Sequence, residues 1–203
     1  MATVGYTTTP TYGYFSEGSG IGNQVGCAFT MPSGGLITAI SCYAATYANS
    51  ETPNLCIWDS SGNLLASVAA SSTISAGAPA WVSGTLATPL FVANGSTIYI
   101  GWSCAVADGF YAEYDNTSNT IHWGEQTSPP GTLGSTVATG SLGAYATYTP
   151  SQAYVNTGTP SSPVWTPAAV VVNTGTPSSP AWSAAAIYVN TGTPSSPVWT
   201  PAS

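Results

Sequence analysis

The end of the chain is built from three copies of one 17-residue sequence, which occupy residues 153–169, 170–186 and 187–203. Each copy carries Val-Asn-Thr-Gly-Thr-Pro-Ser-Ser-Pro at its centre and a Trp shortly after it. Proline lacks a backbone donor and clashes with a preceding helical turn, so these positions exclude a helix. The Thr-Pro-Ser-Ser-Pro segment is typical of a turn. Each copy is therefore predicted to form a strand, a turn and a second strand.

The apolar residues beside these turns follow one another almost without interruption, as from Val164 to Val172. Such runs are typical of strands covered on both faces. A module this small buries little surface alone, and it has no charged residue to prevent edge pairing. We expect the repeats to assemble the chain into a homo-oligomer, most simply a trimer, or to dock on a partner; a one-chain stack is the alternative. The aromatic residues expected in these contacts are Tyr154, Trp165, Trp182, Tyr188 and Trp199.

The charge of the chain is entirely negative, because it contains seven acidic residues and no Lys or Arg. No phosphate backbone can be neutralised by such a chain, which excludes nucleic-acid binding. Electrostatic attachment to anionic lipid is excluded for the same reason. Because no salt bridge can be lost, we also expect acidification to relieve repulsion rather than to destabilise the fold.

No segment has the pattern of a secretory signal, and no apolar run reaches the length that spans a membrane. We expect a protein that is made in the cytoplasm and is not exported by a cleaved signal. Cys27 and Cys104 fall in phase with apolar strand residues and are predicted to be buried thiols. Cys42 and Cys56 could be neighbours on adjacent strands, and their spacing in the sequence does not decide whether they are. No Cys or His spacing indicates zinc, and no cofactor is expected.

Short alternating segments separated by turn residues fill the chain up to about Pro150. This pattern predicts an all-β fold, an antiparallel jelly roll or β-sandwich in residues 1–150, followed by the β-rich repeat module in residues 151–203. Residues 127–141 are predicted to be a polar loop. The expected strands are Asn23–Met31, Leu36–Thr46, Leu55–Asp59, Asn63–Ala69, Trp81–Leu86, Thr97–Val106, Phe110–Asp115, Thr120–Gly124 and Gly143–Thr149.

Two parts of the sequence resemble known proteins. The first part resembles bacterial and phage jelly-roll modules of the carbohydrate-binding type. The residues that carry this resemblance are Leu36–Ile40, Cys56–Asp59, Gly62–Ala66, Trp81, Gly95–Trp102 and Tyr145–Pro150. The Asn-Thr-Gly-Thr…Pro-x-Trp unit resembles short elements of tailed-phage virion proteins, in which a capsid, decoration or fibre protein often carries one copy. The three tandem copies depart from that pattern, so a stalk and a docking patch both remain open.

Catalytic chemistry finds little support in the sequence. Gly18–Gly22 is a glycine-rich loop without the strand and helix that a nucleophile elbow requires. The acidic residues that a glycosidase pair would need are Asp108, Glu113, Asp115 and Glu125, but no apolar setting around them indicates a raised pKa. We expect no enzymatic activity. Asp59 and Asn63 have the residue types of a calcium site, yet a hairpin turn would use them for its own backbone bonds.

One cluster combines an aromatic ring with acids. If the segments Phe110–Asp115 and Thr120–Gly124 pair, then Tyr111, Glu113, Asp115 and His122 share a solvent-facing surface. A ring for stacking and carboxylates for hydroxyl groups are what a sugar site needs, so these four residues are candidate glycan-facing residues. The alternative is a solvated sheet face that carries acids for solubility.

The two resemblances together imply a virion structural protein of a tailed phage, either a capsid decoration (cement) protein or a short fibre. The expected partners are copies of the chain, capsid or other virion proteins, and a host surface glycan, and the expected location is the virion. The alternative is a sugar-binding adhesin, or a surface-layer or filament component of a bacterium, at an extracellular or cell-surface location.

Overall fold

The structure is a computed structural model that describes residues 1–17, 22–46, 49–104, 110–126, 130–151, 153–156, 165–168, 171–173, 182–184, 188–190 and 199–201. Throughout these ranges the regular structure is β-strand, and every pairing between named strands is antiparallel. The all-β prediction is therefore confirmed. Over the described ranges, no helix has the length and apolar character needed to cross a bilayer.

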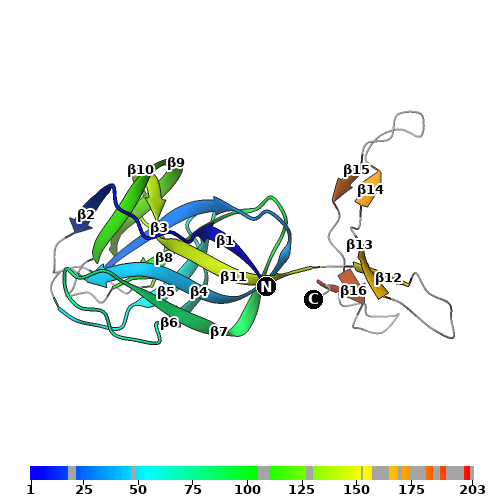
Figure 1. Ribbon diagram of the computed structural model, residues 1–203, viewed down its shortest axis with the longest axis horizontal. Coiled ribbons are helices and arrows are strands. Elements are labelled where there is room, and N and C mark those ends of the chain that lie inside the picture. Colours follow the sequence, from blue (N-terminus) through cyan, green and yellow to red (C-terminus); the bar gives the residue numbers. More distant parts are fainter. Residues whose placement is uncertain are drawn as a thin grey trace.

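Eleven strands before residue 151 form one continuous hydrogen-bonded sheet that folds into two layers (Figure 1). They are β1 (Ala2–Tyr6), β2 (Gly13–Glu17), β3 (Gly22–Thr30), β4 (Gly35–Thr46), β5 (Asn54–Asp59), β6 (Leu64–Ala69), β7 (Ala80–Val92), β8 (Thr97–Ser103), β9 (Phe110–Gln126), β10 (Thr136–Leu142) and β11 (Ala144–Pro150).

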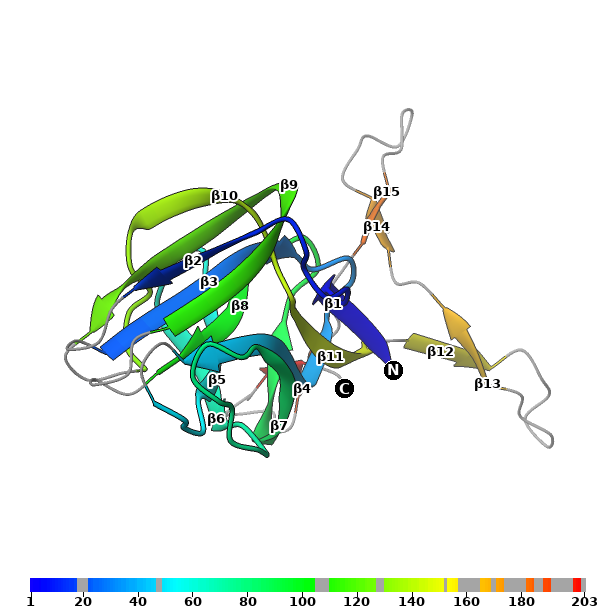
Figure 2. The same ribbon diagram turned by 60° about the vertical axis from the view of Figure 1, so that its left-hand side comes forward.

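The first layer consists of β1, β11, β4 and β7, and the second of β6, β5, β8, β3 and β9, with β2 and β10 also paired to β9 (Figure 2). Strand β4 joins the layers. It pairs with β7 and β11 along most of its length, and its last residues, Ala45 and Thr46, pair with Tyr111 and Phe110 of β9. The result is an antiparallel β-sandwich of the jelly-roll type.

The core lies between the two layers because alternate residues of each strand face inward. Ile37 and Ile40 of β4 meet Ile57 of β5 and Ile100 of β8 there, and all four side chains are fully buried. Each such side chain stabilises the fold by about 2 kcal/mol through removal from water. Since no ion pair with Lys or Arg is available, burial and backbone hydrogen bonds stabilise this sandwich.

A second, smaller cluster lies on the outer face of the second layer, under the segment Pro130–Gly134, here called the cover segment. Leu133 of this segment packs with Trp58 and Tyr99, and its amide donates to the Gly62 carbonyl at 2.8 Å. Buried Gln24 contributes as well, since its Oε1 accepts from the Gly131 amide at 3.0 Å and its Nε2 donates to the Thr132 carbonyl. The segment is therefore part of the folded structure.

Glycine is required where the cover segment touches the sheet. A Cβ on Gly124 would lie 2.7 Å from the Gly134 Cα, and a Cβ on Gly134 would lie 2.2 Å from the Trp123 carbonyl oxygen. These distances leave no room for a side chain, so the two glycines allow the close approach of backbone to backbone.

The structure corrects the strand prediction in four places. Strand β7 continues to Val92, six residues beyond the predicted end at Leu86. Strands β1 and β2 were not expected. Residues 127–141 are not one polar loop, because β10 begins at Thr136 and pairs with β9. Finally, residues 110–126 form one strand rather than two. The missed strands are short or polar and depend on backbone pairing with β9 and β11, which alternation cannot detect.

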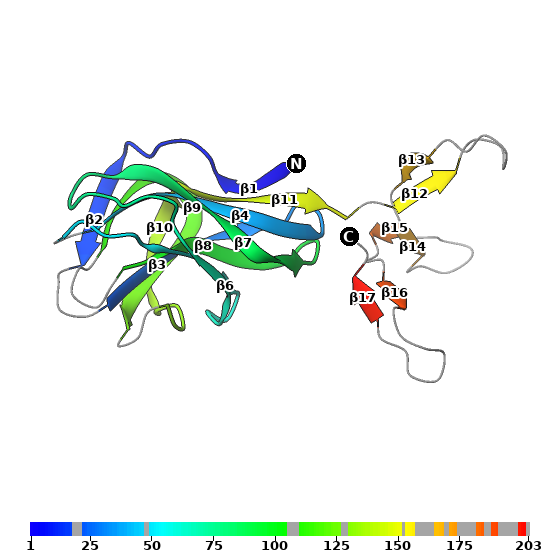
Figure 3. The same ribbon diagram turned by 90° about the horizontal axis from the view of Figure 1, so that it is seen from below.

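Three two-stranded hairpins follow β11 along the chain (Figure 3). Their strands are β12 (Ala153–Asn156), β13 (Trp165–Ala168), β14 (Val171–Asn173), β15 (Trp182–Ala184), β16 (Tyr188–Asn190) and β17 (Trp199–Pro201). In every hairpin the Asn of the first strand is the register partner of the Trp of the second. The strand-turn-strand prediction thus holds for the described strands, while the turns and all repeat side chains lie outside the described residues. The division at residue 150 stays a prediction.

Candidate functional site

The four candidate glycan-facing residues do not come together by strand pairing. Tyr111, Glu113 and Asp115 lie in the first part of β9, and His122 lies in the second part. Between these parts β9 has four additional residues, 116–119, opposite Gly140 of β10. The two parts do not pair with each other, because both belong to one strand whose edges are occupied by β2, β3, β4 and β10, so the condition for grouping the four residues is not met.

His122 lies beside the small cluster that the cover segment packs on. Its ring lies 4.7 Å from that of Tyr99, and its Nε2 is 3.2 Å from the Tyr99 hydroxyl. Tyr99 is largely buried, and burial raises its pKa. His122 is therefore in direct contact with a residue of the small cluster on the second layer.

Asp115 is the anchor of the chain segment that connects the two layers between β1 and β2. Its Oδ2 accepts from the Tyr6 hydroxyl at 2.6 Å, and its Oδ1 accepts from the amides of Thr11 and Tyr12 at 2.8 and 3.1 Å. The Tyr6 hydrogen bond is the largest cause of the lowered pKa of Asp115, followed by the bond from the Thr11 amide. A glycosidase acid needs a raised pKa, so the environment of Asp115 does not suit that role.

Because of such hydrogen bonds, we now expect acidification to lower the stability of the fold, contrary to the expectation from the sequence. Asp115 and Asp59 both have a lowered pKa because hydrogen bonds stabilise their charged forms, and for Asp59 the largest cause is the bond from the Asn63 side chain. A carboxyl group whose pKa is lower in the folded state contributes stability above its unfolded pKa. That contribution is lost as the pH falls through the folded pKa. We therefore expect stability to decrease below about pH 4, the ordinary range of an aspartate.

The variant Tyr6→Phe tests the Asp115 anchor. It removes the largest cause of the lowered pKa, so we expect the pKa of Asp115 to rise toward its ordinary value and the acid-induced loss of stability to become smaller. Carboxyl carbon NMR titration and melting temperatures between pH 7 and pH 2.5 measure these effects. Tyr12→Phe is the matched control, since Tyr12 contacts Asp115 through its backbone amide. Equal titration curves for wild type and Tyr6→Phe would contradict the assignment.

Asp59 is used by the turn of the β5–β6 hairpin. Its Oδ1 accepts from the amides of Ser61 and Asn63 at 2.8 and 2.9 Å, and its Oδ2 accepts from the Asn63 side chain at 2.9 Å. The hairpin turn therefore accounts for Asp59 and Asn63 without a calcium ion. Within the described ranges, no group of three or more His, Cys, Asp or Glu residues has the arrangement of a metal site.

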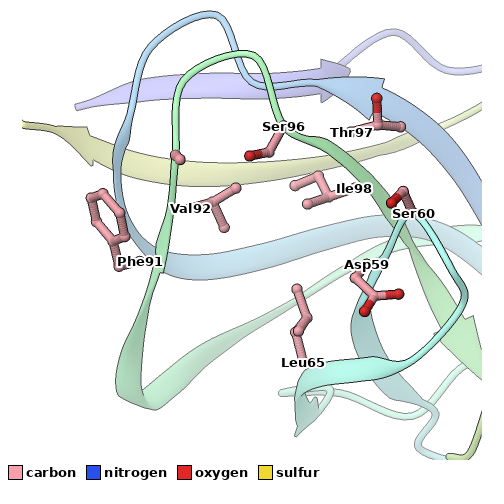
Figure 4. Close-up of a pocket in the computed structure, with 9 residues that line it drawn as sticks. Asp59, Ser60, Leu65, Phe91, Val92, Ser96, Thr97 and Ile98 are labelled. Carbon is pink, nitrogen blue, oxygen red and sulfur yellow. The ribbon is translucent and has the colours of Figure 1, made fainter. Parts of the chain in front are cut away.

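A shallow pocket of about 320 Å³ lies beside this turn (Figure 4). Asp59 and Leu65 of the β5–β6 hairpin line it together with Val92 of β7 and with Ile98 of β8, which is the register partner of Asp59. Leu65 is 43% exposed, and the Asp59 carboxylate is already satisfied by its turn. Ser60, Ser96 and Thr97 also line the pocket, so it combines apolar contact with a few polar groups.

All four cysteines are free and buried. Burial raises the pKa of Cys27 and of Cys56 to about 12, and it also raises the pKa of Cys42. Cys42 and Cys56 lie in β4 and β5, which do not pair with each other. Their thiols remain protonated at neutral pH, so they act as small buried side chains rather than as nucleophiles.

Aromatic rings on the outer surface are the feature that sequence reasoning missed. Tyr14 stacks on Tyr111, with ring centroids 5.2 Å apart and planes 20° apart. Trp81 lies 5.7 Å from Tyr43 and 5.5 Å from Tyr145. Of these five residues only Tyr111 was a candidate. Alternation places Tyr43 and Tyr145 on outward positions, but it does not show that strands distant in sequence bring the rings together.

The geometry defines this chain as an antiparallel β-sandwich followed by hairpin repeats, with aromatic side chains on its outer surface. Residues 7–165, more than half of the chain, match the family described as Domain of unknown function (DUF4082), so the chain belongs to that family. The match ends at Trp165, inside the first repeat. No curated protein and no solved structure matches the chain.

Proposed function

We propose that this protein is a virion structural protein of a tailed phage, a capsid decoration protein or short fibre, whose repeats assemble or attach it and whose sandwich is displayed outward. The observation that carries the proposal is the common register of the three hairpins, in which Asn156, Asn173 and Asn190 each pair with a Trp. A two-stranded hairpin is at best marginally stable alone in water. Three equivalent hairpins therefore favour contacts with other chains.

The sandwich supports a role in display rather than catalysis. Asp115 and Asp59 are held in turn and anchor contacts, and the described thiols are buried. Outward aromatic rings provide a surface for recognition instead. A host surface glycan is the ligand class that such a surface suits, because aromatic rings stack on sugar rings and carboxylates accept hydrogen bonds from hydroxyl groups.

The second candidate is a sugar-binding adhesin, or a surface-layer or filament component of a bacterium. The same aromatic surface favours it, since sugar binding does not depend on a particle. The two candidates differ in where the protein is found. The virion proposal places it on a particle, and the adhesin proposal places it at the cell surface.

Density-gradient fractionation of a lysate from the source culture tests the virion proposal. We expect the protein to sediment with phage particles at a constant ratio to the major capsid protein. We also expect it to remain bound after a wash in 1 M salt (about 3 Å Debye length), because residues 126–203 carry no charged side chain that could form an ion pair. Quantitative mass spectrometry of the gradient fractions measures this ratio. Recovery in the cell-envelope fraction, with none on particles, would reject the virion proposal in favour of the adhesin.

A further inference from the structure

Five aromatic side chains from five different strands form a row, here called the aromatic stripe. Its members are Tyr145 of β11, Trp81 of β7, Tyr43 of β4, Tyr111 of β9 and Tyr14 of β2. Successive ring centroids are 5.5 Å apart from Tyr145 to Trp81, 5.7 Å from Trp81 to Tyr43, and 5.2 Å from Tyr111 to Tyr14. The stripe therefore crosses both layers of the sandwich.

The strand ladder joins the two parts of the stripe. Tyr43 is two residues before Ala45, the register partner of Tyr111 in the short β4–β9 pairing. Residues two apart on a strand share a face, and a ring reaches a diagonal neighbour on the next strand. Tyr43 and Tyr14 both contribute to the raised pKa of Tyr111, after burial and Glu113. Tyr111 thus has a stripe residue on each side.

The stripe lies on the outside of the sandwich. Its sequence neighbours Cys42, Ala44, Ala112, Ala144 and Ala146 are fully buried, so alternation directs the stripe residues away from the core. Tyr14 is 66% exposed, and the other four rings are partly exposed. Amphipathic Tyr and Trp side chains at a surface present an apolar face together with a polar edge.

Polar groups accompany the rings. Glu113 is the register partner of Tyr14, and its carboxylate makes no hydrogen bond to the residues that the structure describes. Ser41 and Ser83 are the next register pair on the same face as Tyr43 and Trp81, and their hydroxyls are 2.8 Å apart. Ser41 is buried and Ser83 is exposed. The Trp81 indole donates to the Thr9 hydroxyl at 3.0 Å, which fixes its orientation. An acceptor beside exposed rings suits a ligand rich in hydroxyl groups.

We propose that the aromatic stripe binds an uncharged, linear polysaccharide. Ring centroids lie 5.5 and 5.7 Å apart in the first layer and 5.2 Å apart in the second. The β4–β9 pairing joins these two groups into a surface longer than one sugar ring, which favours a chain over a monosaccharide. The apolar faces of the sugars stack on the rings, and their hydroxyls donate to Glu113. The chain has a net charge of −7 and no basic residue, so an anionic polymer is repelled and an uncharged one is not.

This inference names the ligand class of the displayed surface and rests on the display role proposed above. The two can nevertheless fail separately. Sugar binding is measured with the isolated 203-residue protein, whereas the virion proposal is measured on particles. A protein that does not bind polysaccharide could still attach to particles, and a protein that is absent from particles could still bind polysaccharide.

Affinity electrophoresis tests the proposal with the full chain. Native gels contain hydroxyethylcellulose, glucomannan or dextran as uncharged polymers, or alginate as an anionic one. We expect at least one uncharged linear polymer to retard the protein and alginate not to. Trp81→Ala and Tyr14→Ala are each expected to weaken binding about tenfold, because each removes one stacked ring. Tyr14→Phe, which keeps the ring, is expected to bind within about threefold of the wild type.

Tyr12→Ala is the matched control, because Tyr12 is 64% exposed but contacts Tyr114 rather than the stripe. It is expected to bind like the wild type. Circular dichroism verifies folding, and exposed Tyr14 gives a usable variant even if Trp81→Ala does not fold. Failure of every uncharged polymer to retard the protein, equal retardation by alginate, or equal binding of both stripe variants and wild type would overturn the proposal. So would self-association that Tyr14→Ala abolishes, because a second copy would then occupy the stripe.

Discussion

Deletion of residues 153–203 is expected to convert an oligomer, most simply a trimer, into a folded monomer that no longer attaches to its particle. The three hairpins are two-stranded sheets that are marginal alone, whereas the sandwich has a complete buried core before residue 151. Light scattering after size exclusion measures the mass, which should fall to that of one shortened chain. Circular dichroism should retain the β signal of the sandwich.

A full-length variant separates the role of the aromatic residues from that of chain length. We expect Trp165, Trp182 and Trp199 to be buried between chains, so that replacement by Ala removes about 2 kcal/mol for each ring, or about 6 kcal/mol per chain. We therefore expect the dissociation constant to rise by about four orders of magnitude. The matched control replaces Thr157, Thr174 and Thr191 by Ser and should keep the oligomer. An unchanged oligomeric state and unchanged particle binding after deletion of residues 153–203 would show instead that the sandwich makes the contacts.

The fold could be predicted where a strand has one buried face. In β3, β4 and β8 apolar residues alternate or run together, and the expected bounds differ from the observed ones by one residue at most except at the end of β8. Strand β10 has the polar sequence Thr-Val-Ala-Thr-Gly-Ser-Leu, and Val137 on it is 55% exposed. Its strand conformation depends on pairing with β9, a long-range contact that leaves no periodic signal.

The candidate site could be predicted only in part. Tyr111 and Glu113 are partly exposed on either side of buried Ala112, as the alternation indicates. The position of His122 was missed because a hairpin between neighbouring segments was assumed, and β9 continues instead. The contact between Asp115 and Tyr6 joins residues 109 positions apart. Such contacts depend on how the layers fold together, and a single sequence does not reveal them.

The cover segment illustrates the same limit. Pro129-Pro130-Gly131 indicates a turn or loop, and residues 130–135 are indeed without strand. The sequence does not show that this loop covers the outer face of the second layer. That role depends on Trp58, whose side chain is fully buried and whose Nε1 donates to the Gly131 carbonyl at 2.8 Å.

Trp58→Ala is therefore expected to cause a large loss of stability in the second layer. Removal of a fully buried Trp costs about 3–5 kcal/mol, since the site collapses only in part. The Gly131 carbonyl also loses its partner, so the cover segment should open. Urea unfolding measures the loss, and hydrogen exchange at the Leu133 amide, which is bonded to Gly62, measures the opening.

Two further variants divide the effect of Trp58 into packing and hydrogen bonding. Trp58→Phe keeps an aromatic ring over Gly26 but removes the indole donor, so we expect an intermediate loss with faster exchange at Leu133. Leu65→Ala on the adjacent strand is the matched control, because Leu65 is 43% exposed and its truncation should cost less than about 1 kcal/mol. A loss below about 1 kcal/mol for Trp58→Ala, with unchanged exchange at Leu133, would show that the cover segment is held independently of Trp58. In that case the bonds between Gln24 and the backbone of Gly131 and Thr132 would be what keeps it on the sheet.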